Sequence, residues 1–193
     1  MHNYMTGLAR IMAMIGGAVL MFLILLTCIS VAGRVLDGVF HGIWMETNLP
    51  QFAEWMAARV GPVNGDFELV EAGVAFAIFS FIPHCQITAG HAAVDVFVNS
   101  LSPRVNRILR MGTEIAFALV LMLIAWRLAE GTLSKYKNGE TSFLLEFPIW
   151  WAYGASLMSA LVAAVVGLYM AAVRSYEAIT GVILVWDGVE VQP

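Results

Sequence analysis

The chain has 193 residues, of which 60% are hydrophobic and 12% are charged, and its formal net charge is −4. Soluble domains carry roughly 25% charged residues, so a chain with half that share cannot cover a surface that faces water. The hydrocarbon of a bilayer must therefore serve as much of its solvent, and we expect one all-α integral membrane module over residues 1–193. The small negative charge and the lack of a basic tail argue against nucleic acid as a partner.

The first transmembrane helix is predicted over about residues 9–34. No charged residue occurs between Arg10 and Arg34. At 1.5 Å per residue, this stretch is long enough to cross a hydrocarbon core of about 30 Å. It is too long for the apolar region of a signal peptide and lacks a small-residue cleavage site, so we expect an uncleaved helix.

The segment from Arg34 to Gly65 is amphipathic and is not expected to span the membrane. Pro50 can occupy the first turn of a short helix, and a Gly-Pro pair follows some ten residues later. Phe52 and Trp55 share one face of that helix. We therefore predict an interfacial helix over about residues 50–60, lying in the headgroup layer with its apolar side down.

The second span is predicted over about residues 66–88, with Asp66 as its N-cap. Glu68 and Glu71 fall in the first two turns, where carboxylates favour the positive end of the helix dipole. Pro83 is expected to kink the helix or to end it.

The third span is predicted over about residues 108–133. Its charges lie near its two ends and have local partners at helical spacing, namely Arg110 with Glu114 and Arg127 with Glu130. The fourth span is predicted over about residues 147–174, followed by a tail over 175–193. Its first turns hold Trp150, Trp151 and Tyr153, which is typical of an aromatic belt at a membrane interface.

Four spans place both termini on one side of the membrane. Lysine and arginine divide five against five between the two sides, so a simple count does not give the orientation. Arg104, Arg107 and Arg110 form the densest cluster, immediately before a span, which favours cytoplasmic termini. Topology alone explains these arginines, and binding of anionic lipid headgroups is the alternative.

No catalytic, metal, cofactor or substrate site is predicted. The histidines do not form an intramembrane pair for haem, and no metal-binding spacing occurs. The nearest candidates for a buried ion site are Glu71 and Glu114, and each has a structural explanation close to a helix end.

Small residues recur every four positions along the fourth span, at Ala155, Ser159, Ala163, Gly167 and Ala171. Such a stripe lets a second helix approach closely, which drives association in lipid. The second helix could belong to another protein or to this chain, and the sequence leaves both open.

Several short motifs follow one another from about residue 65 to residue 174. They are Glu68-x-x-Glu71, the run from Gly90 and His91 to Asp95 and Val96, Leu101-Ser102-Pro103-Arg104, Gly139-Glu140-Thr141-Ser142, and Pro148-x-Trp150-Trp151-x-Tyr153. In this order around four spans, they resemble the small membrane subunit (Q or DctQ type) of the tripartite ATP-independent periplasmic (TRAP) transporters.

The resemblance implies a non-catalytic permease subunit in a bacterial inner membrane, with both termini in the cytoplasm. It implies two protein partners: a large multi-span subunit (M or DctM type) and a periplasmic binding protein (P or DctP type). In such a system the large subunit moves sodium and a small organic acid by an elevator motion, and the small subunit resembles a stator. The sequence does not name the substrate.

The connection over residues 34–65 is longer than in many members of this family. It would lie on the periplasmic side, and we hypothesise that it helps to dock the binding protein. Two other functions remain as alternatives: an anchor or assembly subunit of a different membrane complex, and a small membrane redox enzyme, which the missing histidine pair disfavours.

Overall fold

The structure of the chain is a computed structural model, which describes residues 2–42, 47, 50–57, 59, 61–88, 90, 102–182 and 184–185. The helices of these residues are α1 (His2–Phe40), α3 (Pro50–Ala57), α4 (Asp66–Ile87), α6 (Pro103–Asn138) and α7 (Trp150–Thr180). All except α3 are long and apolar enough to cross a membrane. The predicted all-α membrane fold with a short helix between the first and second spans is confirmed.

Three of the four long helices, α1, α6 and α7, extend beyond the apolar stretches that predicted them. The first helix has 39 residues, a length of about 58 Å against a hydrocarbon core of about 30 Å. The last helix continues to Thr180, six residues beyond its predicted apolar stretch. Hydropathy locates only the part of a helix that lipid surrounds, and the polar flanks continue the helix on either side of it.

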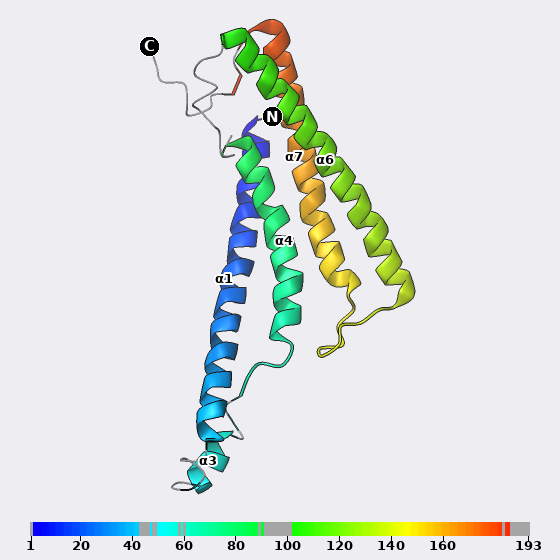
Figure 1. Ribbon diagram of the computed structural model, residues 1–193. Helices are drawn as coiled ribbons and strands as arrows, with labels where there is room; N and C mark the ends of the chain where they lie inside the picture. Colours follow the sequence, from blue (N-terminus) through cyan, green and yellow to red (C-terminus); the bar gives the residue numbers. More distant parts are fainter. Residues whose placement is uncertain are drawn as a thin grey trace.

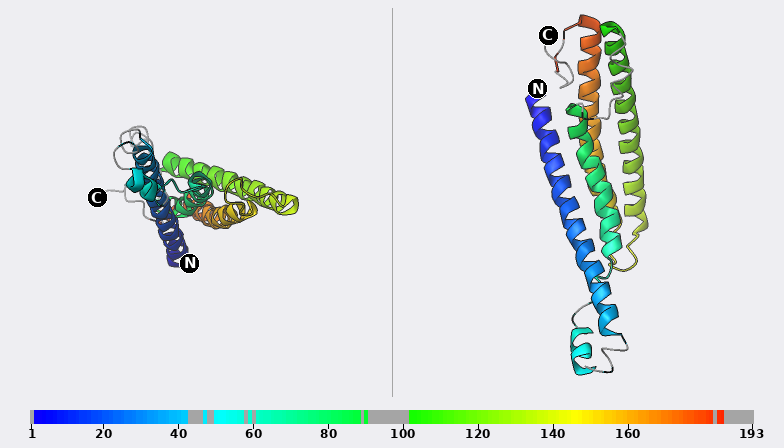
Figure 2. Two further views of the ribbon diagram at one scale, coloured as in Figure 1. Left: turned by 90° about the horizontal axis from the view of Figure 1, so that it is seen from below. Right: turned by 60° about the vertical axis from the view of Figure 1, so that its left-hand side comes forward.

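The four long helices form a row in the order α1, α4, α7, α6 (Figure 1). Extensive contacts join α1 to α4, α4 to α7 and α7 to α6, whereas α1 touches α7 only slightly. Figure 2 shows the same helices from below, on the left, and turned by 60° about the vertical axis, on the right. Along the helix axes the bundle has two ends. The starts of α1 and α6 and the ends of α4 and α7 lie at one of them, here called the termini end. The other end, which holds Phe40, Asp66, Asn138 and Trp150, is called the hairpin end.

Close backbone approach explains the contact between α1 and α4. A Cβ atom added to Gly16 would lie 2.7 Å from the Cβ of Ser80, so only glycine fits there. Further along α1, a Cβ added to Gly33 would collide with the carbonyl oxygen of Gly61. The segment that leads into α4 therefore runs directly against α1.

The start of α4 is held by an ion pair to α1. Arg34 Nη2 lies 2.7 Å from Asp66 Oδ2, and the side chain of Asp66 is only 10% exposed. The predicted N-cap was off by one position: Gly65, with φ 78°, is the N-cap, and Asp66 is the first helical residue. Pro83 does not end α4, which continues to Ile87.

An ion pair with both side chains buried ties down the chain after α7. Arg174 Nη1 lies 2.7 Å from Glu177 Oε2, and both side chains are 6% exposed. The other oxygen of Glu177 accepts hydrogen bonds from the backbone N–H groups of Leu184 (2.7 Å) and Val185 (2.9 Å). Val185 in turn packs with Ala9 of α1 in a buried cluster. The beginning of the predicted tail is therefore folded against the helix bundle.

Candidate functional site

Two helices that pack on opposite sides of α7 diverge toward the hairpin end. Near the termini end, α4 and α6 are joined by a hydrogen bond from Gln86 Nε2 to Glu114 Oε2 of 2.9 Å. Glu114, which the sequence pairs with Arg110 one turn earlier, thus also links α6 to α4. Toward the hairpin end the two helices separate and leave α7 between them (Figure 1).

This divergence leaves a groove of about 610 Å³ over α7, here called the hairpin groove. Residues of α4 form one wall of the groove, and the start of α7 forms its floor. Leu128 of α6 also lines the groove, and the α6–α7 loop closes it at the hairpin end. The lining is largely aromatic and aliphatic, from Phe67, Glu68, Glu71, Ala72, Ala75, Phe79, Leu128, Thr141, Ser142, Phe143, Phe147, Ile149, Ala152, Tyr153 and Ser156.

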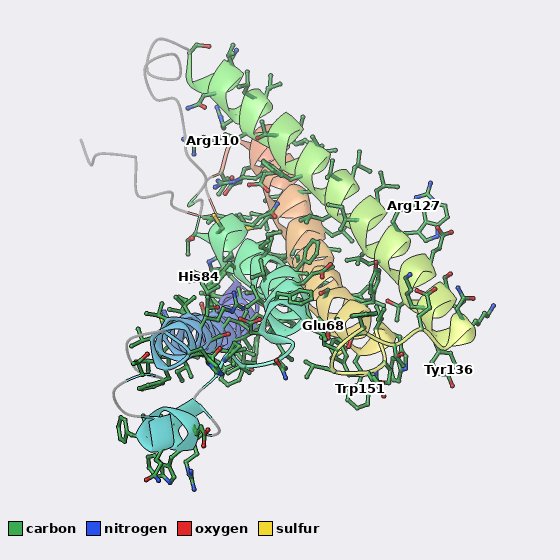
Figure 3. All side chains as sticks on the ribbon, turned by 60° about the horizontal axis from the view of Figure 1, so that its bottom comes forward. Glu68, His84, Arg110, Arg127, Tyr136 and Trp151 are labelled. Atoms are coloured by element: carbon green, nitrogen blue, oxygen red, sulfur yellow. The ribbon has the colours of Figure 1, made fainter. Side chains whose placement is uncertain are left out.

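Glu68 fixes the loop that closes the groove. Its two carboxylate oxygens accept hydrogen bonds from the backbone N–H groups of Leu144 (2.8 Å) and Leu145 (3.0 Å). Thr141 and Pro148 form an isolated β-bridge that closes the base of the same loop. Figure 3 shows Glu68 on α4 beside the start of α7. A carboxylate that accepts two backbone donors holds a loop more firmly than a neutral group would.

Glu71 lies one turn further along α4 and also lines the groove. Its side chain is exposed, and no residue of the described part donates a hydrogen bond to it or pairs with it. The two glutamates of the predicted family motif thus differ: Glu68 is occupied by this chain, whereas the carboxylate of Glu71 is available to another molecule.

The hairpin end of α6 and α7 carries polar and aromatic groups suited to a membrane interface. Lys135 and Asn138 donate hydrogen bonds to Glu140, and the bond from Lys135 is the main cause of the lowered pKa of Glu140. The rings of Tyr136 and Trp150 meet edge to face at 5.4 Å. Figure 3 shows Tyr136 and Trp151 at this end of α6 and α7. Such residues are typical of helix ends near a headgroup layer.

The structure places most of the small-residue stripe inside the chain. Ser159 and Ala163 are fully buried, and the hydroxyl oxygens of Ser159 and Ser80 lie 3.0 Å apart between α7 and α4. A Cβ on Gly167 would lie 3.2 Å from Leu121 of α6. Ala171 is buried as well, and only Ala155 is exposed. The stripe therefore packs against this chain's own helices, the alternative that its sequence left open.

The arginines singled out in the sequence lie toward the two ends of the helix bundle. Arg104 is exposed at the termini end, and Arg107 and Arg110 are partly buried. Arg127 pairs with Glu130 at 3.0 Å on α6, as predicted, and projects outward in Figure 3. His91 and Asp95 lie outside the described residues.

The buried charges of the described part have partners within the chain. They are Asp66 with Arg34, Glu68 with two backbone N–H groups, Glu114 with Gln86, and Arg174 with Glu177. Among the residues that the structure describes, no group of three or more His, Cys, Asp or Glu side chains could hold a metal ion. The local chemistry is that of packing and hydrogen bonding.

Sequence reasoning found Glu68 and Glu71 but not the difference between them. The dipole argument treats two carboxylates in the first turns of a helix alike. The contact that separates them joins positions 76 residues apart, Glu68 and Leu144, and local periodicity carries no signal for it.

Comparison with known proteins supports a family assignment. No curated protein and no solved structure matches the chain. The family described as tripartite ATP-independent periplasmic transporters, DctQ component, matches residues 49–177, which is about two thirds of the chain. This match confirms the resemblance drawn from the motifs: the chain belongs to the DctQ component family of the TRAP transporters.

Proposed function

We propose that this small TRAP permease subunit is a non-catalytic stator, which braces the fixed part of a large elevator-type membrane subunit. The complex imports a small organic acid together with sodium, and a periplasmic binding protein delivers the substrate. Membership of the family supports one part of this proposal, namely a small permease subunit that works with the other two components.

One observation carries the stator role: the buried charged side chains of the described part are held by partners within the chain. A subunit that moved an ion would need ionisable groups that exchange partners inside the membrane. Here the ion pairs and hydrogen bonds join neighbouring helices or fix chain ends, so they favour one fixed arrangement. A fixed block is what a sliding partner requires beside it.

The proposed topology places both termini in the cytoplasm and the hairpin end in the periplasm, in a bacterial inner membrane. Arg104, Arg107 and Arg110 support it, because arginine beside a span favours the cytoplasmic side. In this topology the exposed Arg104 would stand at the level of anionic headgroups, and membrane lipid is its proposed partner.

The test is uptake by reconstituted transporter in proteoliposomes. We expect accumulation of a labelled organic acid only when this chain, its large subunit and the binding protein are all present with an inward sodium gradient. Uptake that is unchanged without this chain would contradict the proposal. Stable association with a different large membrane complex, and none with the TRAP large subunit, would favour an anchor or assembly subunit.

A further inference from the structure

We propose that the hairpin groove receives one transmembrane helix of the large permease subunit, and that a lysine or arginine of that helix pairs with Glu71. This inference rests on the proposed function, because it assumes that the large subunit is the partner. It adds the face of the small subunit that is used and the chemistry of the contact.

The shape of the groove suits a helix. Ala72, Ala75, Ala152 and Ser156 are among its lining residues, and small side chains let another helix backbone come close in lipid. Phe79 and Tyr153 also line it and offer apolar contact to side chains of the incoming helix. Because Gln86 and Glu114 join α4 and α6 near the termini end and the α6–α7 loop closes the hairpin end, the groove opens to the face above α7.

The charge of the groove defines what that helix carries. Glu71 lies five residues after the start of α4, about 7.5 Å along the helix axis. Beside the apolar lining of the groove an unpaired carboxylate is costly, and a cation that meets it there is only partly hydrated, so the pair is stronger than on a water-exposed surface. The chain supplies no such cation from its described residues.

A phospholipid suits the same groove less well. Glu68 and Glu71 both line it, and a phosphate beside two carboxylates is repelled. A lysine or arginine side chain brings a positive charge without a phosphate. A helix also delivers that cation and the apolar contacts on one rigid element.

Photocrosslinking in the complete complex tests the position of the contact. A photoreactive phenylalanine analogue replaces Phe79, which lines the groove, and Met158 serves as the matched control. Met158 is 69% exposed and lies about 200° around α7 from the buried groove residue Ser156. We expect a crosslink to the large subunit from position 79 and none from position 158.

Charge removal tests the pairing. Glu71→Gln keeps the size of the side chain, and Glu130→Gln removes a carboxylate from the exposed pair with Arg127 on α6. We expect Glu71→Gln to weaken binding of the large subunit about fivefold or more, and Glu130→Gln to leave it unchanged. Suppressors of Glu71→Lys should replace a lysine or arginine of the large subunit with an acidic residue.

The outcomes separate this inference from the proposed function. If the large subunit binds the unmodified chain, the inference is overturned by a Phe79-position crosslink to phospholipid alone, by a crosslink from position 158 only, or by unchanged binding of Glu71→Gln. If the large subunit does not bind the unmodified chain at all, the proposed function itself fails.

Discussion

At the scale of single residues, the two glutamates at the start of α4 show how similar side chains acquire different tasks. Glu68 is 7% exposed and accepts two backbone hydrogen bonds from the α6–α7 loop, whereas Glu71 is exposed one turn later. The loop makes this difference, because it passes over the first turn of α4 and not over the second. Glu68 thus serves the structure of this chain, and Glu71 is left for contacts outside it.

We predict that Glu68→Ala loosens this loop. The backbone N–H groups of Leu144 and Leu145 lose their acceptor and become open to solvent. Hydrogen exchange of the full chain in detergent should then become roughly tenfold faster at these two amides. Glu71→Ala is the matched control, since it removes a carboxylate of the same helix that accepts no hydrogen bond from the described residues. Equal exchange in the two variants would contradict the role given to Glu68.

At the scale of helices, α7 is the central element of the packing between α4 and α6. It is the most buried of the four long helices and contacts both α4 and α6. Val166 and Met170 of α7 are fully buried in a cluster with Ala9 of α1 and Ile87 of α4. The alanine and glycine positions of α7 bring its neighbours close enough for this packing.

We predict that Gly167→Leu destabilises the chain itself. The new side chain would start 3.2 Å from Leu121 and 3.6 Å from the backbone of Ala118, where no space remains. Overpacking of this kind costs roughly 1–3 kcal/mol, which corresponds to a melting temperature lower by roughly 2–10 °C for a chain of this size. Thermal unfolding of the full chain in detergent measures it.

Gly112→Leu is the control for that experiment, because nothing lies within 4 Å of a Cβ added to Gly112 on α6. Both changes gain the same helix propensity, so their difference reports packing alone. An unaltered melting temperature for Gly167→Leu, combined with weaker binding of the large subunit, would instead place a second protein against the stripe.

Local sequence patterns predict the helices, but they do not predict contacts between positions that lie far apart in the chain. Apolar stretches located all four spans, and Pro50 located the start of α3. The cap of α4 was missed by one position because the choice between Gly65 and Asp66 depends on a left-handed backbone and on the pair with Arg34. The hairpin groove exists because α4 and α6 diverge. The angle between them depends on contacts between positions far apart in the sequence, such as the hydrogen bond from Gln86 to Glu114.

At the scale of the whole molecule, the chain is asymmetric along its row of helices. The first helix continues past the start of α4, and α3 packs beside its end (Figure 1). There the rings of Phe40 and Phe52 meet edge to face at 6.3 Å, and the guanidinium of Arg59 lies 4.3 Å from the centre of the Trp55 ring. Phe52 and Trp55 nevertheless remain about half exposed, at 47% and 52%. An apolar surface at the outer end of the molecule is typical of a site that contacts a membrane or a protein.

We predict that replacing residues 47–60 with a flexible Gly-Ser linker of equal length impairs docking of the binding protein and leaves the membrane part intact. The ion pair of Arg34 with Asp66 and the contact of Gly33 with Gly61 lie outside the replaced segment, so the start of α4 stays in place. Uptake should therefore need a several-fold higher concentration of binding protein to reach half its maximum, and the maximum itself should be retained. Co-purification with the large subunit is the control and should be unchanged. Uptake that depends on binding protein as in the unmodified transporter would refute a docking role and leave α3 as an element that only rests on the bilayer surface.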